Sequence, residues 1–318
     1  MSAKHFQTPL QENEGVLEGP WRHPRNILNE QTYDGHASIH DDETAKKLGF
    51  KGGAVEGPTH FSQIAPLGDA IWGDEWWRTG CISAHYRNPV FDGEQVQPFL
   101  KRPAAGADIA EIWALKEDGS EVFRGTASVR NAAPTELETR LATLPPLEKS
   151  VILRDVKIGA VLPRRPAKMG LNQHMGPLYP FTLADKLKVI TETADLYESA
   201  AAAKTSFGRA AIPMEMISVL IGSISKDGDW PTKGPAVGLF ADQEIRLFNG
   251  PLFVDEPFEI EREVVALSGS RRTESIWVRT KIFRPGELNP AAAMLLNQAI
   301  LVESYAPYAA EKAALYGA

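Results

Sequence analysis

The apolar positions of this chain predict one long buried helix followed by a run of strands, and this order occurs twice. In the first half, FSQIAPLGDAIW (61–72) is apolar around most of its circumference, which predicts the buried helix. Four segments of alternating apolar and polar residues follow it and predict strands at 82–86, 95–101, 107–116 and 122–130. Asp118 and Gly119 predict a hairpin turn between the last two strands.

The second half repeats this order. PMEMISVLIGSIS (213–225) predicts another buried helix, and strands are expected at 244–248, 257–267, 275–283 and 294–305. A further amphipathic helix is expected over 182–197, because its apolar residues share one helical face: Leu183, Leu187, Ile190, Ala194 and Tyr197. A long buried helix combined with antiparallel strands indicates the α+β class.

Two pairs of similar segments indicate an internal duplication. HYRNPVFDGEQVQPFLKR from His85 is similar to IRLFNGPLFVDEPFEIERE from Ile245, and GFKGGAVEG from Gly49 is similar to SFGRAAIPM from Ser206. The matched positions are Pro89 with Pro251, Phe91 with Phe253, Glu94 with Glu256, Phe50 with Phe207 and Ala54 with Ala211. A repeat at about half the chain length predicts two similar domains, 1–130 and 151–318. The segment 131–150 has the composition of a linker, with room for a short helix in ELETRLATL.

Charge and cysteine content narrow the class of protein. The chain of 318 residues has the length of two domains, and its formal charge of −7 argues against a nucleic-acid partner. Cys81 has no second cysteine to pair with, so we expect a reducing compartment and predict a cytoplasmic location. The sequence shows neither the apolar run of a signal peptide nor that of a membrane helix, and we expect no membrane partner.

The segment 33–60, YDGHASIHDDETAKKLGFKGGAVEGPTH, carries the candidate chemistry. His40 is followed by a short helix with an acidic start, DDETAKKLGF, and then by a glycine-rich turn. The apolar helix begins after this turn, near Gly57. A histidine at this place can activate a water molecule if a carboxylate reaches the same water.

This order of residues resembles the active-site segment of the MaoC-like hydratases, the (R)-specific enoyl-CoA hydratase branch of the hotdog fold. The residues in register with the pattern of that family are His40, Asp42, Ala45, Gly49, Phe50 and Gly57. Ala37 stands in place of the family's asparagine, and Glu56 in place of its second histidine. The resemblance implies a double hotdog fold. It also implies a carbon–oxygen lyase that adds water to the double bond of a 2-enoyl thioester, or forms this double bond by removing water. Coenzyme A is expected as part of the substrate, with no other cofactor.

The resemblance also suggests roles for single residues. His40 is the candidate base, with Asp34 or His36 as its partner; the alternatives are a helix-capping histidine and two solvent-exposed turn residues. Glu56 is a second candidate catalytic group, or else a carboxylate that stabilises the helix N-terminus. Gly57 and Thr59 are expected to offer N–H groups to the thioester oxygen, because a helix N-terminus has free donors. His60 and Tyr33 are assigned to substrate binding.

The second half lacks these groups. Tyr197 occupies the position of His40, and Pro213 that of Glu56, so we interpret this half as scaffold and acyl tunnel. Two clusters have open interpretations. The basic segment with Arg164, Arg165 and Lys168 either binds the phosphates of coenzyme A or is a solvated loop. The tryptophans of IWGDEWWR, Trp72, Trp76 and Trp77, either line the acyl pocket or are buried against the other half or a partner.

Two other functions compete with the lyase. A hotdog thioesterase would use Glu56 to activate water, and a non-catalytic binding protein would not depend on His40. No Cys and His spacing typical of a metal site occurs, so no metal is expected. Exposed sheet edges and the tryptophan cluster predict a homodimer.

Overall fold

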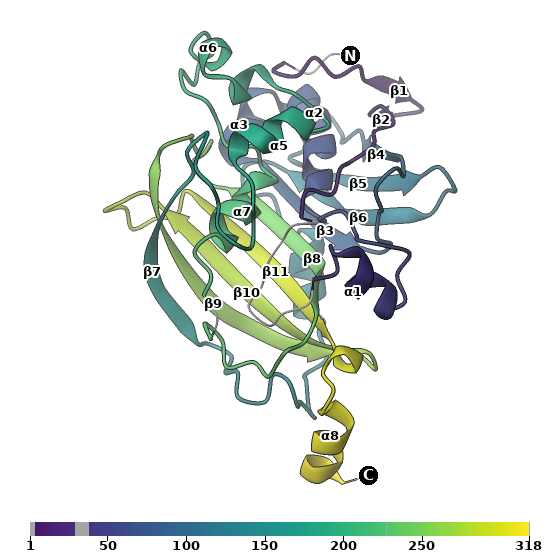
Figure 1. Ribbon diagram of the computed structural model, residues 1–318. Helices are drawn as coiled ribbons and strands as arrows, with labels where there is room; N and C mark the ends of the chain where they lie inside the picture. The colour runs from purple at the N-terminus through teal and green to yellow at the C-terminus, as the bar shows by residue number, and fades with distance from the viewer. Residues whose placement is uncertain (1–3, 29–37, 227, 318) are drawn as a thin grey trace.

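The computed structural model describes residues 4–28, 38–226 and 228–317. Within these residues eleven antiparallel strands form one curved sheet in the order β1-β2-β4-β5-β6-β3-β8-β11-β10-β9-β7 (Figure 1). The first half supplies β1 (Gln11–Asn13), β2 (Val16–Glu18), β3 (Cys81–Tyr86), β4 (Val96–Lys101), β5 (Ile109–Lys116) and β6 (Glu121–Ser128). The second half supplies β7 (Val161–Lys168), β8 (Gly238–Leu247), β9 (Pro257–Gly269), β10 (Thr273–Phe283) and β11 (Ala292–Leu301).

The two halves join where β3 pairs with β8, with Ser83 opposite Glu244. The duplication predicted from the sequence is visible in the backbone on either side of this seam. Isolated bridges pair Ala54 with Phe91 in the first half and Ala211 with Phe253 in the second. These are the residues that the sequence comparison had matched, so that part of the prediction is confirmed.

The matched glutamates also play the same structural role. The carboxylate of Glu94 accepts a hydrogen bond from the N–H of Phe91 at 3.0 Å, and that of Glu256 accepts one from Phe253 at 3.1 Å. Each glutamate also pairs with a cation at 2.8 Å, Lys116 in the first half and Arg284 in the second. The equivalent turns therefore have equivalent anchors.

Each half contains a central helix, and the two helices differ in length. Helix α2 (Thr59–Trp72) has 14 residues and is buried from Thr59 to Asp69, whereas α7 (Met216–Gly222) has 7. They begin alike, because the N–H of Thr59 donates to Glu56 O and the N–H of Met216 donates to Pro213 O. The helix α7 ends where the ring of Tyr179 packs on Gly222, at which a Cβ would lie 2.4 Å from the ring. The shorter helix covers less of its sheet.

The remaining helices are short. They are α1 (Asp42–Lys47), α3 (Asp74–Thr79), α4 (Glu136–Ala142), α5 (Leu183–Val189), η1 (Asp195–Tyr197), α6 (Ser199–Ala202), η2 (Val302–Ser304) and α8 (Tyr308–Tyr316). The helix α8 extends away from the body of the molecule at the C-terminal end (Figure 1). The described residues contain no helix with both the length and the apolar character needed to cross a bilayer.

Two expectations about secondary structure were wrong. The helix expected over 182–197 ends early, because Ile190 has the extended ψ of 134° and only η1 follows it. The segment expected to be a loop around Arg164 is the edge strand β7, which pairs with β9. Its two prolines lie on a sheet edge, the one place where a strand tolerates a missing N–H. The short pair β1 and β2 was not predicted.

The segment between the two sets of strands contains the short helix α4, as expected from ELETRLATL. Thr135 and Glu138 form a capping box at its start, which satisfies two of the free N–H groups. Leu137 is fully buried and packs with Trp277 and Leu295. The helix thereby fastens the linker to the outer face of the sheet, while the domain boundaries at 130 and 150 remain a prediction.

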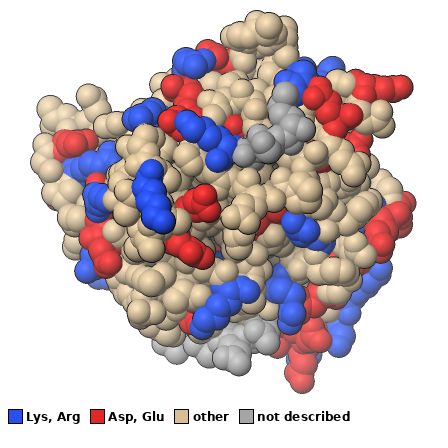
Figure 2. Space-filling model, turned by 90° about the horizontal axis from the view of Figure 1, so that it is seen from above, with Lys and Arg blue, Asp and Glu red and all other residues tan. Residues whose placement is uncertain are grey.

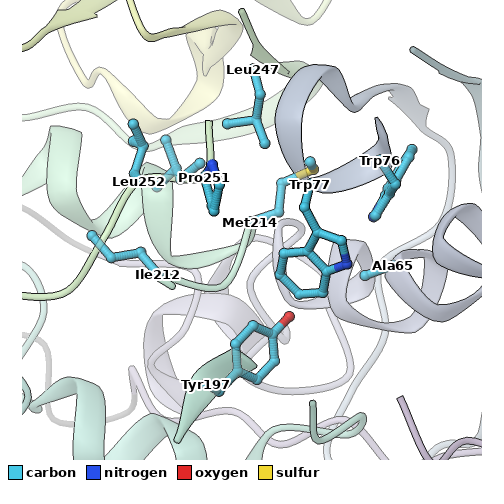
Figure 3. A pocket seen from close by; sticks show the side chains of 10 residues that line it. Ala65, Trp76, Trp77, Tyr197, Ile212, Met214, Leu247, Pro251 and Leu252 are labelled. Atoms are coloured by element: carbon cyan, nitrogen blue, oxygen red, sulfur yellow. The ribbon is translucent and has the colours of Figure 1, made fainter. Parts of the chain in front are cut away.

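The tryptophan cluster lies between the halves. Trp76 and Trp77 of α3 border a space of only about 20 Å³, together with Tyr197 and Met214 of the second half (Figure 3). The rings of Trp77 and Tyr197 meet edge to face with centroids 5.8 Å apart. Burial against the other half, one of the two interpretations of this cluster, is therefore confirmed for Trp76 and Trp77. On the face shown in Figure 2, basic and acidic side chains are interspersed.

Candidate active site

A cavity of about 810 Å³ extends between the two halves. The first half contributes the segments 38–40 and 54–57, with His60 and Tyr86 beside them. The second half contributes α7, the loop after it and the inner face of β8, β10 and β11. Because α7 is short, the cavity occupies sheet surface that a longer helix would cover. The site is therefore shared between the two halves, and the second half contributes both apolar and charged side chains to its wall.

His40 lines this cavity and is held by its backbone and its ring. Its Nδ1 lies 2.6 Å from the carbonyl oxygen of Ala54. A carbonyl only accepts hydrogen bonds, so Nδ1 carries the proton and Nε2 has the lone pair. A Cβ at Gly53 would lie 2.2 Å from the carbonyl oxygen of His40, so only glycine fits there. Among the described residues nothing is hydrogen-bonded to Nε2.

The environment keeps this imidazole neutral. Burial lowers the pKa of His40, and the hydrogen bond to Ala54, which favours the charged form, offsets only part of this effect. The helix α1 fixes the segment that follows, because Asp41 caps it by accepting from the N–H of Thr44 at 2.8 Å. The result is a neutral histidine with one available nitrogen in a cavity, which is a competent base.

Glu56 lines the same cavity and is 8% exposed. Burial raises its pKa to about 7; the charge of Glu215 adds to this, while Lys186 and hydrogen bonds from Ser218 and Tyr179 oppose it. The hydroxyl of Ser218 lies 3.5 Å from Oε1 of Glu56, at the outer limit of a hydrogen bond. Near neutral pH this carboxyl group therefore exists in both protonation states, as a general acid or base requires.

A buried ion pair, formed by Lys186 and Glu215, lies close to Glu56 and was not predicted from the sequence. Lys186 Nζ lies 3.3 Å from Oε1 of Glu215 and donates to Oγ1 of Thr59 at 3.1 Å. Lys186 is 3% exposed and Glu215 2%. Burial raises the pKa of Glu215, and Lys186 offsets part of that rise. The pair thus brings both signs of charge close to Glu56 without solvent to screen them.

Gly57, just before α2, is the other residue that was expected to offer its N–H to the thioester oxygen. Its N–H has no acceptor among the described residues, and the residue lines the cavity. A Cβ here would lie 2.6 Å from the ring of Tyr86, so glycine is required for the close approach of this ring. Thr59 does not share the role expected for it, because its N–H donates to Glu56 O at 3.1 Å. Its hydroxyl is occupied by Lys186.

His60 also lines the cavity, although it is 2% exposed. Gln63 donates its amide to the carbonyl of Val96, so its Oε1 faces Nδ1 of His60, 2.9 Å away. This orientation places the proton of His60 on Nδ1. Burial lowers its pKa to about 4, so it is neutral at physiological pH. A role in substrate binding through Nε2 stays a prediction.

Three predicted site residues lie outside the described part of the chain. Tyr33, Asp34 and His36 fall in the segment 29–37. The choice between Asp34 and His36 as partner of His40 therefore stays open, whereas Glu56 is placed at the cavity. In the described ranges no three His, Cys, Asp or Glu side chains gather as a metal ion would require.

Solved structures with the same architecture are distant in sequence. No model of a known protein family matches the chain, and no curated protein matches it. A putative MaoC domain protein dehydratase from Chloroflexus aurantiacus is similar with a TM-score of 0.55 at 14% identity, over 94% of this chain and 95% of that one. A conserved hypothetical protein from Mycobacterium tuberculosis with a double hotdog fold is similar with a TM-score of 0.53 at 8% identity, over 92% and 99%.

These likenesses cover nearly the whole of each chain, so they apply to both halves and to the way the halves are joined. They confirm the expected α+β class and, at the level of the fold, the expected resemblance to the MaoC-like proteins. The chain has the double hotdog fold, and its architecture is similar to that of the protein described as a putative MaoC domain dehydratase.

Proposed function

We propose that the protein is a hydratase or dehydratase that acts on the double bond of a 2-enoyl thioester, with coenzyme A as the thiol. One observation carries the proposal: three groups border one cavity. They are a neutral imidazole with an available nitrogen, a carboxyl group with a pKa of about 7, and the N–H of Gly57 just before α2, which has no acceptor among the described residues. The fold supports the same class of reaction, since a MaoC domain dehydratase shares it.

The three groups divide the work of hydration. His40 Nε2 takes a proton from water, and the hydroxide oxygen forms a bond to Cβ of the substrate. The electron pair of the double bond moves toward the thioester, and the N–H of Gly57 stabilises the negative oxygen of the enolate. Protonated Glu56 then gives its proton to Cα. The proton on His40 returns to Glu56 through solvent, and dehydration runs through the same steps in reverse.

The second half provides room for the acyl group. The inner face of its sheet borders the cavity with Val278, Leu296 and Ile300, among other apolar residues. Apolar walls of this kind bind an acyl chain by removing its surface from water. The proposed substrate therefore has a longer acyl chain than crotonyl-CoA.

The direct test is the loss of ultraviolet absorbance when purified protein is mixed with crotonyl-CoA and with longer enoyl-CoA thioesters. We expect hydration, with a higher kcat/KM for the longer chains. Absence of hydration with every chain length, together with absence of dehydration from the matching 3-hydroxyacyl-CoA thioesters, would contradict the proposal.

A thioesterase is the second candidate, favoured by the position of Glu56 one residue before Gly57. In that reaction the ionised carboxylate would activate water for attack on the thioester carbon, and free coenzyme A would be released. A thiol reagent distinguishes the two reactions, because hydration leaves the thioester intact. Release of thiol from saturated acyl-CoA that depends on Glu56 would identify the thioesterase.

A further inference from the structure

The inner wall of the cavity also carries a charged group on strand β9 of the second half. Arg262 of β9 lines the cavity and is 8% exposed. Its guanidinium contacts Asp229 at 2.5 Å and donates to Oγ of Ser225 at 3.0 Å. Arg165 of β7 reaches the same carboxylate at 2.7 Å. Two guanidinium groups therefore meet one carboxylate at this place.

The charges at this end of the cavity do not balance. Burial by itself would raise the pKa of Asp229, but the bonds from Arg165 and the backbone of Lys226 and the charge of Arg262 outweigh it, so the pKa is lowered. Asp229 is thus a full anion, but it faces two cations. Of the other basic side chains that line the cavity within the described residues, Arg87 pairs with Glu121 and Lys233 with Glu311. The unbalanced positive charge is therefore local, because Arg165 and Arg262 share the single carboxylate of Asp229.

A second group beside Arg262 lacks a partner. Thr280 is directly opposite Arg262 in the pairing of β9 with β10, so their side chains leave the sheet on the same side. Thr280 lines the cavity and is 1% exposed. Its hydroxyl has no hydrogen-bond partner among the described residues. A buried hydroxyl without a partner costs about 1–3 kcal/mol, so its presence here needs an explanation.

Polar and apolar groups connect this end with the candidate catalytic end. The hydroxyl of Tyr86, whose ring packs on Gly57, donates to Gln243 of β8 at 2.9 Å. The amide of Gln243 contacts the sulfur of Met294 at 3.3 Å, and Met294 is opposite Thr280. From β8 to β9 the cavity floor crosses three strand intervals, which is about 14 Å at about 4.8 Å each.

We propose that Arg262 and Thr280 form a subsite for a carboxylate at the far end of the acyl chain, so that the substrate is a dicarboxylic acyl thioester. This rests on the proposed function and narrows its substrate class. A carboxylate there would accept from the guanidinium and from the Thr280 hydroxyl, and it would balance the second cation. Charge-assisted bonds in a water-poor cavity are the stronger kind of hydrogen bond.

Binding of saturated thioesters tests the subsite without any need for catalysis. Glutaryl-, adipyl-, suberyl- and sebacyl-CoA are each compared by calorimetry with the alkyl acyl-CoA of the same carbon number. At one chain length we expect the acyl-CoA with a terminal carboxylate to bind at least about tenfold more tightly than the alkyl acyl-CoA of equal carbon number. This ratio corresponds to the free energy of one hydrogen bond to a charged group. Arg262→Met should bring this ratio close to one.

Two further variants separate ligand binding from folding. Thr280→Val removes the unpartnered hydroxyl at nearly constant shape, so it should keep or raise the melting temperature while it lowers the carboxylate preference severalfold. Arg164→Met is the matched control, because Arg164 stacks on Phe283 and pairs with Glu259 and does not line the cavity. It should leave the ratio unchanged.

The anion that Arg262 binds has one other source, the phosphates of coenzyme A. Thioesters of the same acyl groups with N-acetylcysteamine, which has no phosphate, distinguish the terminal carboxylate from the phosphates of coenzyme A. Preference for the carboxylate that persists on N-acetylcysteamine supports the subsite. Two results would overturn the subsite. One is equal affinity for the carboxylate-ended and the alkyl thioesters at every chain length. The other is a loss of affinity in Arg262→Met that is the same for the carboxylate-ended and the alkyl thioesters of coenzyme A and is absent with the thioesters of N-acetylcysteamine. Failure of enoyl hydration would instead contradict the proposed function alone.

Discussion

The hydroxyl oxygen of Ser218, on the central helix of the second half, lies 3.5 Å from Oε1 of Glu56, which precedes the central helix of the first half. The buried Lys186 and Glu215, which shift the pKa of Glu56, also belong to the second half. The pKa of Glu56, the candidate acid, is therefore set in part by residues more than a hundred positions away in sequence. The second half contributes to the candidate chemistry through its charges as well as through its walls.

Replacement of His40 tests the candidate base. His40→Ala removes the group proposed to accept the proton of water, and we expect kcat for enoyl-CoA hydration to fall by about 10²–10⁴-fold with little change in KM. His23→Ala is the control, since His23 is exposed and does not line the cavity. Hydration by His40→Ala at the rate of the unmodified protein would exclude the proposed site.

The pH dependence of hydration should reflect both groups. Protonated Glu56 is required, so kcat/KM, which reports the pKa values of the free protein, should decline as the pH rises through about 7, the pKa of this carboxyl group. His40 must be neutral, and because its pKa is lowered, the acidic limb should lie below the ordinary titration range of histidine. In Glu56→Gln the alkaline limb should disappear and the remaining rate should be low. An alkaline limb that survives in Glu56→Gln would assign it to another group.

Glu56 should also make the stability of the fold depend on pH. Its folded pKa, about 7, is above the ordinary 4.5, so between these values the folded state holds a proton that the unfolded state has lost. The free energy of unfolding should therefore decrease as the pH rises over this range, by about 3 kcal/mol at 1.36 kcal/mol per pKa unit. Glu56→Gln should lose this slope in urea titrations at several pH values. An equal slope in both proteins would contradict the raised pKa.

The ion pair of Lys186 and Glu215 predicts a strongly non-additive pair of mutations. Lys186→Met leaves a buried carboxylate without its cation and should cost about 3–5 kcal/mol of unfolding free energy. The double variant Lys186→Met/Glu215→Leu removes both charges and should recover most of that loss. Lys188→Met, on the same helix but 71% exposed, should cost less than about 1 kcal/mol. Additive effects in the double variant would show that the two side chains do not interact.

Gly57→Ala places a Cβ 2.6 Å from the ring of Tyr86, so either the ring or the backbone must move. We expect a loss of about 1–3 kcal/mol in unfolding free energy. Displacement of the N–H should lower kcat more than it changes KM, by up to the 10²–10³-fold typical of a lost oxyanion donor. Gly52→Ala is the control, because its Cβ would meet only the flexible end of Asp42, at 3.1 Å. A normal kcat in Gly57→Ala would remove this N–H from the mechanism.

The architecture was predictable because it depends on patterns that repeat. The alternation of apolar residues located most of the strands to within a few residues, and the matched alanines and phenylalanines proved to be paired in the same way in both halves. The edge strand β7 was not predicted, because its prolines and basic residues interrupt the alternation of apolar positions. Edge strands need few buried residues, so their pattern is weak.

The candidate site was only partly predictable. His40, Glu56 and Gly57 came from one continuous segment. Tertiary packing alone brings Arg262 to the cavity and the ion pair of Lys186 and Glu215 close to Glu56. A signal for Lys186 did exist: it lies in the apolar stripe formed by Leu183, Leu187 and Ile190, where a charged residue needs a buried partner. Which partner it finds depends on how the second half docks, and no local pattern contains that information.

The unequal lengths of the two central helices, 14 and 7 residues, have an evolutionary consequence. In an assembly of two identical subunits, any deletion that shortens one helix shortens the other, so extra space for substrate would be gained at the expense of the catalytic end. Fusion into a single polypeptide removes this coupling. One copy can then shed helical turns to accommodate new ligands while its twin preserves the chemistry, which makes the second copy the place where relatives of this protein should differ most in substrate choice.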